Sequence, residues 1–180
     1  QDAINAKMLI EPYEGWYVVC NQPPLPLTQE QMDFTYSLPY ERTFHPKYHY
    51  VPAIEEVQFS ITSNRGCFGA CTFCAITSHQ GRVISTRSVE SVVEEAKTIT
   101  QMPNFKGYIH DVGGPSANFS RPACDKQTTH GACPKKQCLW PKPCSNLKVD
   151  HTHYVDMLNA VRALPGIKKV FIRSGIRYDY

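Results

Sequence analysis

The order of hydrophobic periods between residues 57 and 180 constrains the fold of this chain more than any other feature. Apolar and polar residues alternate over 57–62, which is the period of a β-strand. The segments at about 107–112 and at 168–175 (KKVFIRSG) also predict strands. A helix is predicted in each interval between them. The order strand, helix, strand, helix, strand predicts an α/β fold with parallel pairing.

Both predicted helices have an apolar face at helical spacing. In the first, Ser88 is the predicted N-cap and the helix ends before Pro103. Its predicted core face is Val89, Val92, Val93, Ala96 and Ile99, and its predicted solvent face is Glu90, Glu94 and Glu95. In the second, Pro165-Gly166 ends the helix, and the core face is Tyr154, Met157, Leu158, Val161 and Leu164.

Residues 1–56 are rich in proline and tyrosine, and we interpret them as an N-terminal extension with only short regular structure. The stretch TQEQMDF at 28–34 predicts a helical turn or two, with Thr28 as N-cap and Gln31 at the capping-box position.

Bulk composition describes an ordinary globular chain and points to no macromolecular partner. The chain has 180 residues, 42% of them hydrophobic, so one compact unit is expected. The net charge of +3, without a run of five like charges, gives no indication of nucleic acid. No apolar run approaches the roughly 18 residues of a membrane span, and no signal peptide is evident. We therefore expect a cytoplasmic location. Because the chain begins at Gln1 and stops at Tyr180 after an apolar segment, we expect a piece of a longer protein.

Seven of the eight cysteines fall into two groups. The first is Cys67-x3-Cys71-x2-Cys74, directly after the first predicted strand, and the second is Cys124, Cys133, Cys138 and Cys144. The remaining one, Cys20, is interpreted as a small buried hydrophobic residue. In a reducing compartment such groups are more often metal ligands than disulfides.

Three thiols suit a site with one open coordination position. A structural zinc normally takes four ligands, whereas a four-iron cubane has one ligand position per iron, so three cysteines leave one iron open. Gly66 and Gly69 let the backbone approach a bulky cluster. Arg65 and Arg82 add positive charge, or are simply solvated loop arginines. His79 is a candidate polar contact with a structural role as the alternative.

A glycine pair, Gly113-Gly114, closes the second predicted strand. In parallel sheets, sites gather at the carboxyl ends of the strands, so the first cysteine group and the glycine pair are expected on one rim. Asp111 and Arg173 lie near strand ends and are candidate site-lining residues. Their structural alternative is an ordinary salt bridge or strand-end hydrogen bond.

The stretches RGCFGACTFCAITSHQGR, DVGGPSAN and IRSGIRYDY together resemble the YgiQ-type (UPF0313) radical S-adenosylmethionine (SAM) proteins. The motif CxxxCxxC with an aromatic residue before the last cysteine carries the likeness, which covers most of the chain. The resemblance implies a partial (β/α) barrel, of which residues 57–180 are the first three β/α units. It also implies an enzyme that reductively cleaves SAM to a 5′-deoxyadenosyl radical, which acts on a substrate that the sequence does not indicate.

The resemblance also implies roles for individual residues. Cys67, Cys71 and Cys74 each bind one iron of a [4Fe-4S] cluster, and the amino and carboxylate groups of SAM take the fourth iron. Phe73 lies near the adenine, and Gly113 and Gly114 contact the SAM amino group through the backbone. Pro115 departs from the family pattern, where an acidic residue is common, and Ser116 or Asn118 is the replacement polar contact. An electron donor is implied as a partner. Further SAM-binding strands are expected beyond Tyr180, so the chain alone is expected to be inactive.

The second cysteine group lies in an insertion at about 120–147 that is dense in proline and lysine. The insertion has little hydrophobic periodicity, which predicts that it buries little core. We therefore expect a bound metal to cross-link it. The candidates are a structural zinc and an auxiliary iron–sulfur cluster, and the absence of CxxC pairs disfavours zinc. The alternative is two disulfides or unligated thiols.

Two other functions fit parts of the sequence. In a non-catalytic iron–sulfur or zinc-binding module, both cysteine groups would only hold loops together or carry electrons. The open coordination position and the glycine pair favour an enzyme instead, since a structural site needs neither. A disulfide-stabilised secreted domain fits the number of cysteines but not their clustering.

Overall fold

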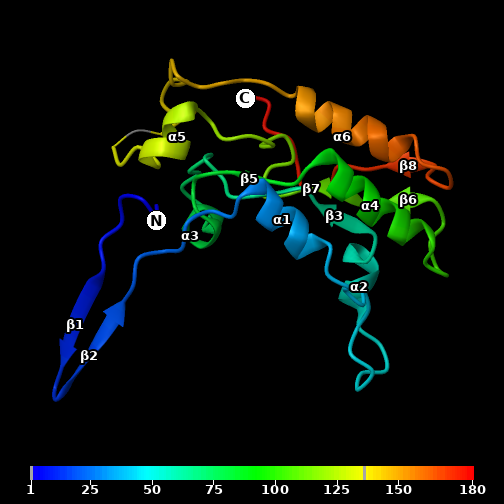
Figure 1. The fold of residues 1–180 in the computed structure, drawn as a ribbon, viewed down its shortest axis with the longest axis horizontal. Coiled ribbons are helices and arrows are strands. Elements are labelled where there is room, and N and C mark those ends of the chain that lie inside the picture. The colour runs from blue at the N-terminus through cyan, green and yellow to red at the C-terminus, as the bar shows by residue number, and fades with distance from the viewer. Residues whose placement is uncertain (1, 136) are drawn as a thin grey trace.

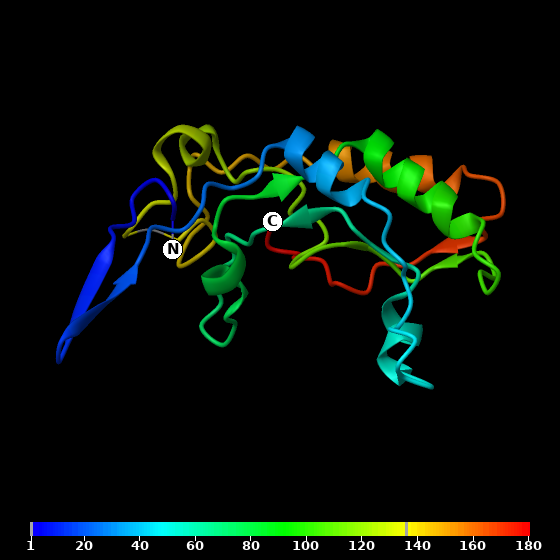
Figure 2. The same ribbon diagram turned by 60° about the horizontal axis from the view of Figure 1, so that its bottom comes forward.

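The structure is a computed structural model that describes residues 2–135 and 137–180. Helices α4 (Val89–Thr100) and α6 (Thr152–Arg162) lie side by side on one face of a set of short strands (Figures 1 and 2). Both helices match the sequence prediction. In the described part of the chain, no helix has the length and apolar character needed to cross a bilayer.

The predicted parallel pairing is confirmed in two short ladders. β3 (Ser60–Thr62) pairs in parallel with β7 (Asp111–Gly113), and β6 (Tyr108–Ile109) pairs in parallel with β8 (Lys169–Val170). The second predicted strand is thus divided at His110, with one half on the first strand and the other half on the third.

The His110 amide donates to the Phe59 carbonyl at 2.9 Å and so continues the contact with the first strand. The chain is therefore mixed α/β, as predicted, with small parallel sheets. Within the described residues these sheets form no closed barrel, and the partial barrel stays a prediction.

The main hydrophobic core lies between the two helices and the strands. Its buried members are Phe59, Ile61, Val92, Ala96, Ile99, Ile109, Val112, Met157 and Val161. Tyr154 is buried too, and its hydroxyl donates to the Val112 carbonyl at 2.7 Å. The apolar positions predicted from helical spacing therefore include those that form this core.

Both predicted N-caps are confirmed. The Ser88 hydroxyl accepts from the Ser91 amide at 3.1 Å at the start of α4. Helix α1 (Gln29–Tyr36) begins with a capping box, in which Thr28 and Gln31 each accept from the other's backbone amide. These local hydrogen bonds satisfy N–H groups that a helix start leaves without partners.

The predicted strand at 57–62 is wrong over its first residues. Val57 is the last residue of a helix, α2 (Pro52–Val57), and the strand begins only at Ser60. Pro52 occupies the first turn of this helix, where its missing N–H costs nothing. Val57 is exposed, so the alternation of apolar and polar residues over 57–62 does not reflect burial at its first position.

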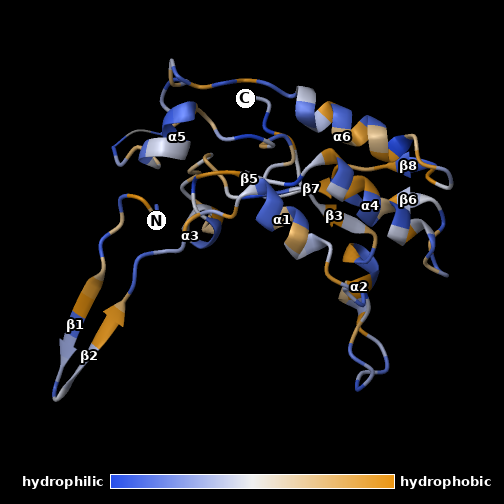
Figure 3. Cartoon of the chain, in the orientation of Figure 1, coloured by the Kyte–Doolittle hydropathy of each residue, from blue (hydrophilic) through white to orange (hydrophobic). Residues whose placement is uncertain are grey.

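A hairpin in the N-terminal region was not predicted. β1 (Leu9–Tyr13) and β2 (Trp16–Cys20) pair antiparallel and extend away from the rest of the chain (Figure 1). Every residue of both strands is exposed, although Figure 3 shows that much of the hairpin is apolar. Cys20 is therefore exposed, and its interpretation as a buried hydrophobic residue is wrong.

Candidate functional site

The first cysteine group lies in a loop between two short strands. β4 (Asn64–Arg65) and β5 (Ser85–Thr86) pair antiparallel and close the base of the loop, which also contains α3 (Ile76–Gln80). Gly66, with φ at 88°, adopts a backbone conformation that suits glycine, and a Cβ there would collide with the Val83 carbonyl. We call residues 66–84 the cysteine loop.

The sulfurs of Cys67 and Cys71 both lie beside Gly69. A Cβ placed on Gly69 would lie 3.4 Å from the Cys67 sulfur and 3.7 Å from the Cys71 sulfur. The Gly69 amide also points at the Cys67 sulfur, at 3.4 Å. Cys74 is held close because its amide donates to the Cys71 carbonyl at 3.1 Å. The same Cβ would lie 2.9 Å from Arg177 Nη1, so a side chain at this position would push the guanidinium away from the two sulfurs.

The electrostatics of Cys67 reflect burial with neighbouring thiols. Burial raises the pKa of the Cys67 thiol, and the Gly69 N–H lowers it. Charge on Cys71 and Cys74 raises this pKa further, while Arg177 lowers it. The raised pKa favours the protonated thiol. Metal binding releases this proton, because the thiolate is the form that binds metals.

Arg177 was not predicted, yet its guanidinium donates to the Cys71 sulfur at 3.0 Å. Asn118 holds the backbone of Arg177 on both sides: its Oδ1 accepts from the Arg177 amide at 3.0 Å and its Nδ2 donates to the Arg177 carbonyl at 2.9 Å. Asp179 binds the same guanidinium and raises the pKa of Arg177. Arg177 lies within the IRSGIRYDY stretch, but only the tertiary fold reveals its contact.

The structure brings the glycine pair next to the strand that enters the cysteine loop. The Ser63 amide donates to the Gly113 carbonyl at 2.8 Å, and a Cβ on Gly114 would collide with the Asn64 carbonyl. Ser116 and Asn118 follow and are buried. Asn118 already uses its amide to hold Arg177, so its contact is with the protein.

Three other candidate residues have simple surroundings. Phe73 is 91% exposed between Cys71 and Cys74. The Asp111 carboxylate accepts from the amides of Arg173 and Ser174, which is a strand-end hydrogen bond. The Arg173 side chain donates to Glu56. Asp111 and Arg173 therefore make the strand-end hydrogen bonds and the salt bridge that were the structural alternative to lining a site.

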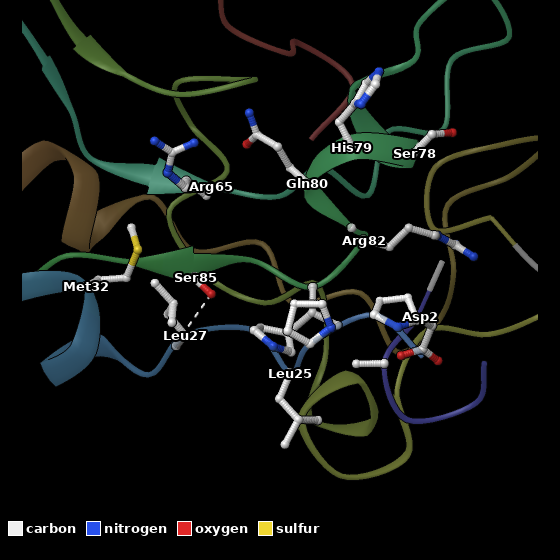
Figure 4. A pocket seen from close by; sticks show the side chains of 16 residues that line it. Asp2, Leu25, Leu27, Met32, Arg65, Ser78, His79, Gln80, Arg82 and Ser85 are labelled. Carbon is white, nitrogen blue, oxygen red and sulfur yellow. Dashed lines mark hydrogen bonds between the residues drawn. The ribbon is translucent and has the colours of Figure 1, made fainter. Parts of the chain in front are cut away.

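The candidate basic residues Arg65, His79 and Arg82 line one hollow, but Arg65 and Arg82 have different hydrogen-bond partners. The Arg65 guanidinium donates to the Tyr36 hydroxyl at 3.1 Å. Together with His79, Arg65 lines a hollow of about 300 Å³ between the N-terminal segment and the cysteine loop (Figure 4). In this hollow the Ser85 hydroxyl donates to the Leu27 carbonyl at 2.8 Å. The three cysteines of the first group are not among its lining residues.

Arg82 lines the same hollow, and its guanidinium donates to the carbonyl of Cys133, a member of the second cysteine group, at 2.8 Å. All eight cysteines lie in the described part of the chain and are free. The disulfide alternative for the second group therefore has no counterpart in the structure.

The donor set of the first group fits a polynuclear cluster. Among residues 2–135 and 137–180, no three or more His, Cys, Asp or Glu side chains are arranged to hold one metal ion. A four-iron cluster takes each thiolate at a different iron, so its ligands do not converge on a single point. The sulfurs of Cys67 and Cys71 lie beside Gly69, and the amide and the guanidinium directed at them are donors of the kind that such a cluster uses.

Comparisons with known proteins agree with the sequence motifs. Residues 1–60 match a family described as Radical SAM N-terminal. A UPF0313 protein of Clostridium botulinum (strain Okra / Type B1) is 57% identical over the whole chain, and one of Clostridium perfringens (strain SM101 / Type A) is 56% identical. The chain spans 28% of the length of each of these relatives. No solved structure matches it.

Proposed function

Because the chain belongs to the UPF0313 family of radical SAM proteins, we propose that Cys67, Cys71 and Cys74 hold a [4Fe-4S] cluster with one iron open to SAM. The observation that carries this proposal is that the sulfurs of Cys67 and Cys71 both lie beside Gly69, where the Gly69 amide and the Arg177 guanidinium donate to them. When bound, such a cluster supplies the electron that cleaves SAM to a 5′-deoxyadenosyl radical, and the protein supplies ligation and orientation.

The cysteine loop and the residues packed against it provide hydrogen-bond donors to the sulfurs and an apolar surface behind them. The Gly69 amide and the Arg177 guanidinium direct hydrogen bonds at the sulfurs of Cys67 and Cys71. Behind Cys67, the rings of Phe68 and Phe119 stack with centroids 3.9 Å apart. Such hydrogen bonds and low solvent exposure tune the potential of an iron–sulfur centre. These residues therefore hold the thiolates in place and keep water from one side.

The glycine pair and the aromatic residue complete the proposed SAM site. Gly113 and Gly114 lie next to the strand that enters the cysteine loop, and we assign their backbone to the SAM amino group. Ser116 is the replacement polar contact for the acidic residue of the family pattern. The exposed ring of Phe73 is free to cover the adenine. In this proposal Asn118 acts through Arg177, because its amide is already engaged there.

The activity is proposed for the full-length protein, since the chain spans 28% of its relatives. We place that protein in a reducing, cytoplasmic environment, because free thiols and iron–sulfur clusters persist there. It requires an electron donor, and its substrate binds to surfaces that include parts outside this chain.

The experiment is anaerobic reconstitution of the full-length protein with iron and sulfide, followed by reduction with SAM present. We expect 5′-deoxyadenosine, measured by mass spectrometry, and a strong loss of it in Cys71→Ala. Cys20→Ala is the matched control, because this exposed thiol lies outside both groups and should leave the product yield unchanged. A reconstituted, reduced and SAM-saturated protein that forms no 5′-deoxyadenosine would contradict the proposal.

A further inference from the structure

The second cysteine group is Cys124, which is the N-cap residue of the short helix α5 (Asp125–His130), and Cys133, Cys138 and Cys144, which follow that helix in the sequence. The four thiols are free, Cys133 is exposed, and the other three are partly buried. The radical SAM site described above uses none of them. Their surroundings decide whether they form a site of their own.

One buried glutamine connects two members of the group. The Gln127 side chain is only 2% exposed, and its Nε2 is directed at the Cys138 sulfur at 3.7 Å. Its Oε1 accepts from the Ala123 amide at 3.1 Å, which fixes the orientation of the amide. The Gln127 backbone amide donates to the Cys124 carbonyl at 3.1 Å. A buried amide fixed in this orientation donates toward sulfur, and hydrogen bonds to the sulfurs are among the factors that tune an iron–sulfur centre.

Arg82 supplies a cation to the same place. Its guanidinium donates to the Cys133 carbonyl at 2.8 Å and also hydrogen-bonds the Cys138 thiol. Burial raises the pKa of the Cys138 thiol, and Arg82 lowers it. Arg82 therefore links the backbone of Cys133 to the side chain of Cys138. Positive charge beside clustered sulfurs stabilises them as thiolates.

Backbone hydrogen bonds connect Cys144 to Cys138 and close the loop that contains them. The Cys144 amide donates to the Cys138 carbonyl at 2.9 Å. The Lys148 amide donates to the Ala123 carbonyl at 2.8 Å, so the two ends of the loop meet. Much of the surface between them is exposed, including Trp140 at 69%. The loop therefore has a closed base but little core of its own.

The group is attached to the cysteine loop through apolar packing. Leu139 is buried in a cluster with Cys67, Phe68 and Ala123, and Cys138 packs against that cluster. The position of Cys138 is therefore set by the same packing that buries Cys67.

We propose that Cys124, Cys133, Cys138 and Cys144 bind an auxiliary iron–sulfur cluster, with Gln127 and Arg82 as hydrogen-bond donors to its ligands. Four thiolates close the shell of a [4Fe-4S] cluster, so this site has no open iron and takes no SAM. Each thiol releases its proton to solvent on binding. The spacing lacks the paired CxxC ligands typical of structural zinc, and the donors directed at Cys138 are those that tune iron–sulfur centres.

The test uses the full-length protein with Cys67, Cys71 and Cys74 all changed to alanine, so that the proposed SAM cluster is absent. After anaerobic reconstitution we expect this triple variant to retain about four irons and four sulfides per chain. Adding Cys138→Ala should remove them, together with the visible absorbance, while adding Cys20→Ala should not. Equal iron in the triple variant with and without Cys138→Ala would overturn the proposal, and so would one zinc in place of iron.

A second variant separates loss of the cluster from loss of the fold. In the triple-alanine background, Arg82→Gln keeps all four proposed thiol ligands but removes the cation at Cys138. We expect it to retain iron, with a midpoint potential more negative than that of its parent, measured by EPR-monitored titration. An unchanged midpoint would contradict the arrangement around Cys138. Circular dichroism of each variant shows whether the fold is intact.

Discussion

The Arg177 guanidinium lies 3.0 Å from the Cys71 sulfur, although 106 residues separate them in the sequence. Asn118 and Asp179 hold Arg177 in this position. A cation fixed against a thiolate ligand stabilises the added negative charge when a cluster is reduced, which raises its potential.

Replacing Arg177 by Gln should therefore make the first cluster harder to reduce and easier to lose. A hydrogen bond to a charged group contributes about 1.5–3 kcal/mol, so we expect iron to dissociate roughly tenfold faster or more. Iron release to a chelator and the EPR midpoint measure these effects. Arg177→Lys should restore part of the potential, and the exposed Arg162→Gln should change neither quantity. A wild-type midpoint and release rate in Arg177→Gln would contradict this role.

Glu95 should be essential to the stability of α4. Its carboxylate pairs with Arg87, which is fully buried, and with Arg42. Burial lowers the pKa of Arg87 to about 10, so the guanidinium stays charged at neutral pH. Removing one partner of a buried pair leaves an uncompensated charge, and we expect Glu95→Gln to lower the free energy of unfolding by about 3–5 kcal/mol.

Glu94 provides the matched control on the same helix. It pairs with Lys97, but its side chain is 70% exposed, so Glu94→Gln should cost less than about 1 kcal/mol. Urea unfolding of the full-length protein measures both variants. Equal losses for Glu94→Gln and Glu95→Gln would show that burial of the pair is not decisive.

The Gly114→Ala substitution should destabilise the rim where the proposed SAM site lies. The added Cβ collides with the Asn64 carbonyl, which is backbone and cannot rotate away. Overpacking of this kind typically costs about 1–3 kcal/mol. Thermal unfolding should show a lower midpoint, and a midpoint equal to wild type would mean that the rim is not as tightly packed as the structure has it.

His153 should make the protein less stable in mild acid. Burial lowers the pKa of His153, with help from Arg121, so the folded state binds the proton less well than the unfolded state. Its contribution is complete above the unfolded pKa of about 6.5 and is lost as the pH falls through and below that value. Unfolding free energies between pH 7.5 and 5 should fall less steeply in His153→Gln than in wild type or in the exposed His49→Gln. Identical slopes in all three proteins would contradict this assignment.

The sequence predicted those features of the fold that depend on residues close together in the chain, such as the helix caps. Ser88 and Thr28 cap helices as expected, because a cap involves only residues within one turn. The parallel pairing followed from the order of elements. The β1–β2 hairpin escaped prediction because its residues are exposed on both faces, so its hydrophobic pattern does not reflect a core.

Long-range contacts were beyond the sequence patterns. Helical spacing placed Glu95 on the solvent face, but Arg87 and Arg42 reach it from other segments. Spacing identified both cysteine groups, whereas the cations that serve them, Arg177 and Arg82, depend on tertiary packing. Arg82 was expected at the first group and lies at the second.

The most direct test of the central claim is the EPR spectrum of the reduced first cluster with and without SAM. A full-length variant lacking Cys138 and Cys144 isolates this signal from the proposed auxiliary cluster. If three cysteines leave one iron open, addition of SAM should change the g-values. An identical spectrum at saturating SAM would mean that the fourth iron is already coordinated by the protein, and the account would be wrong.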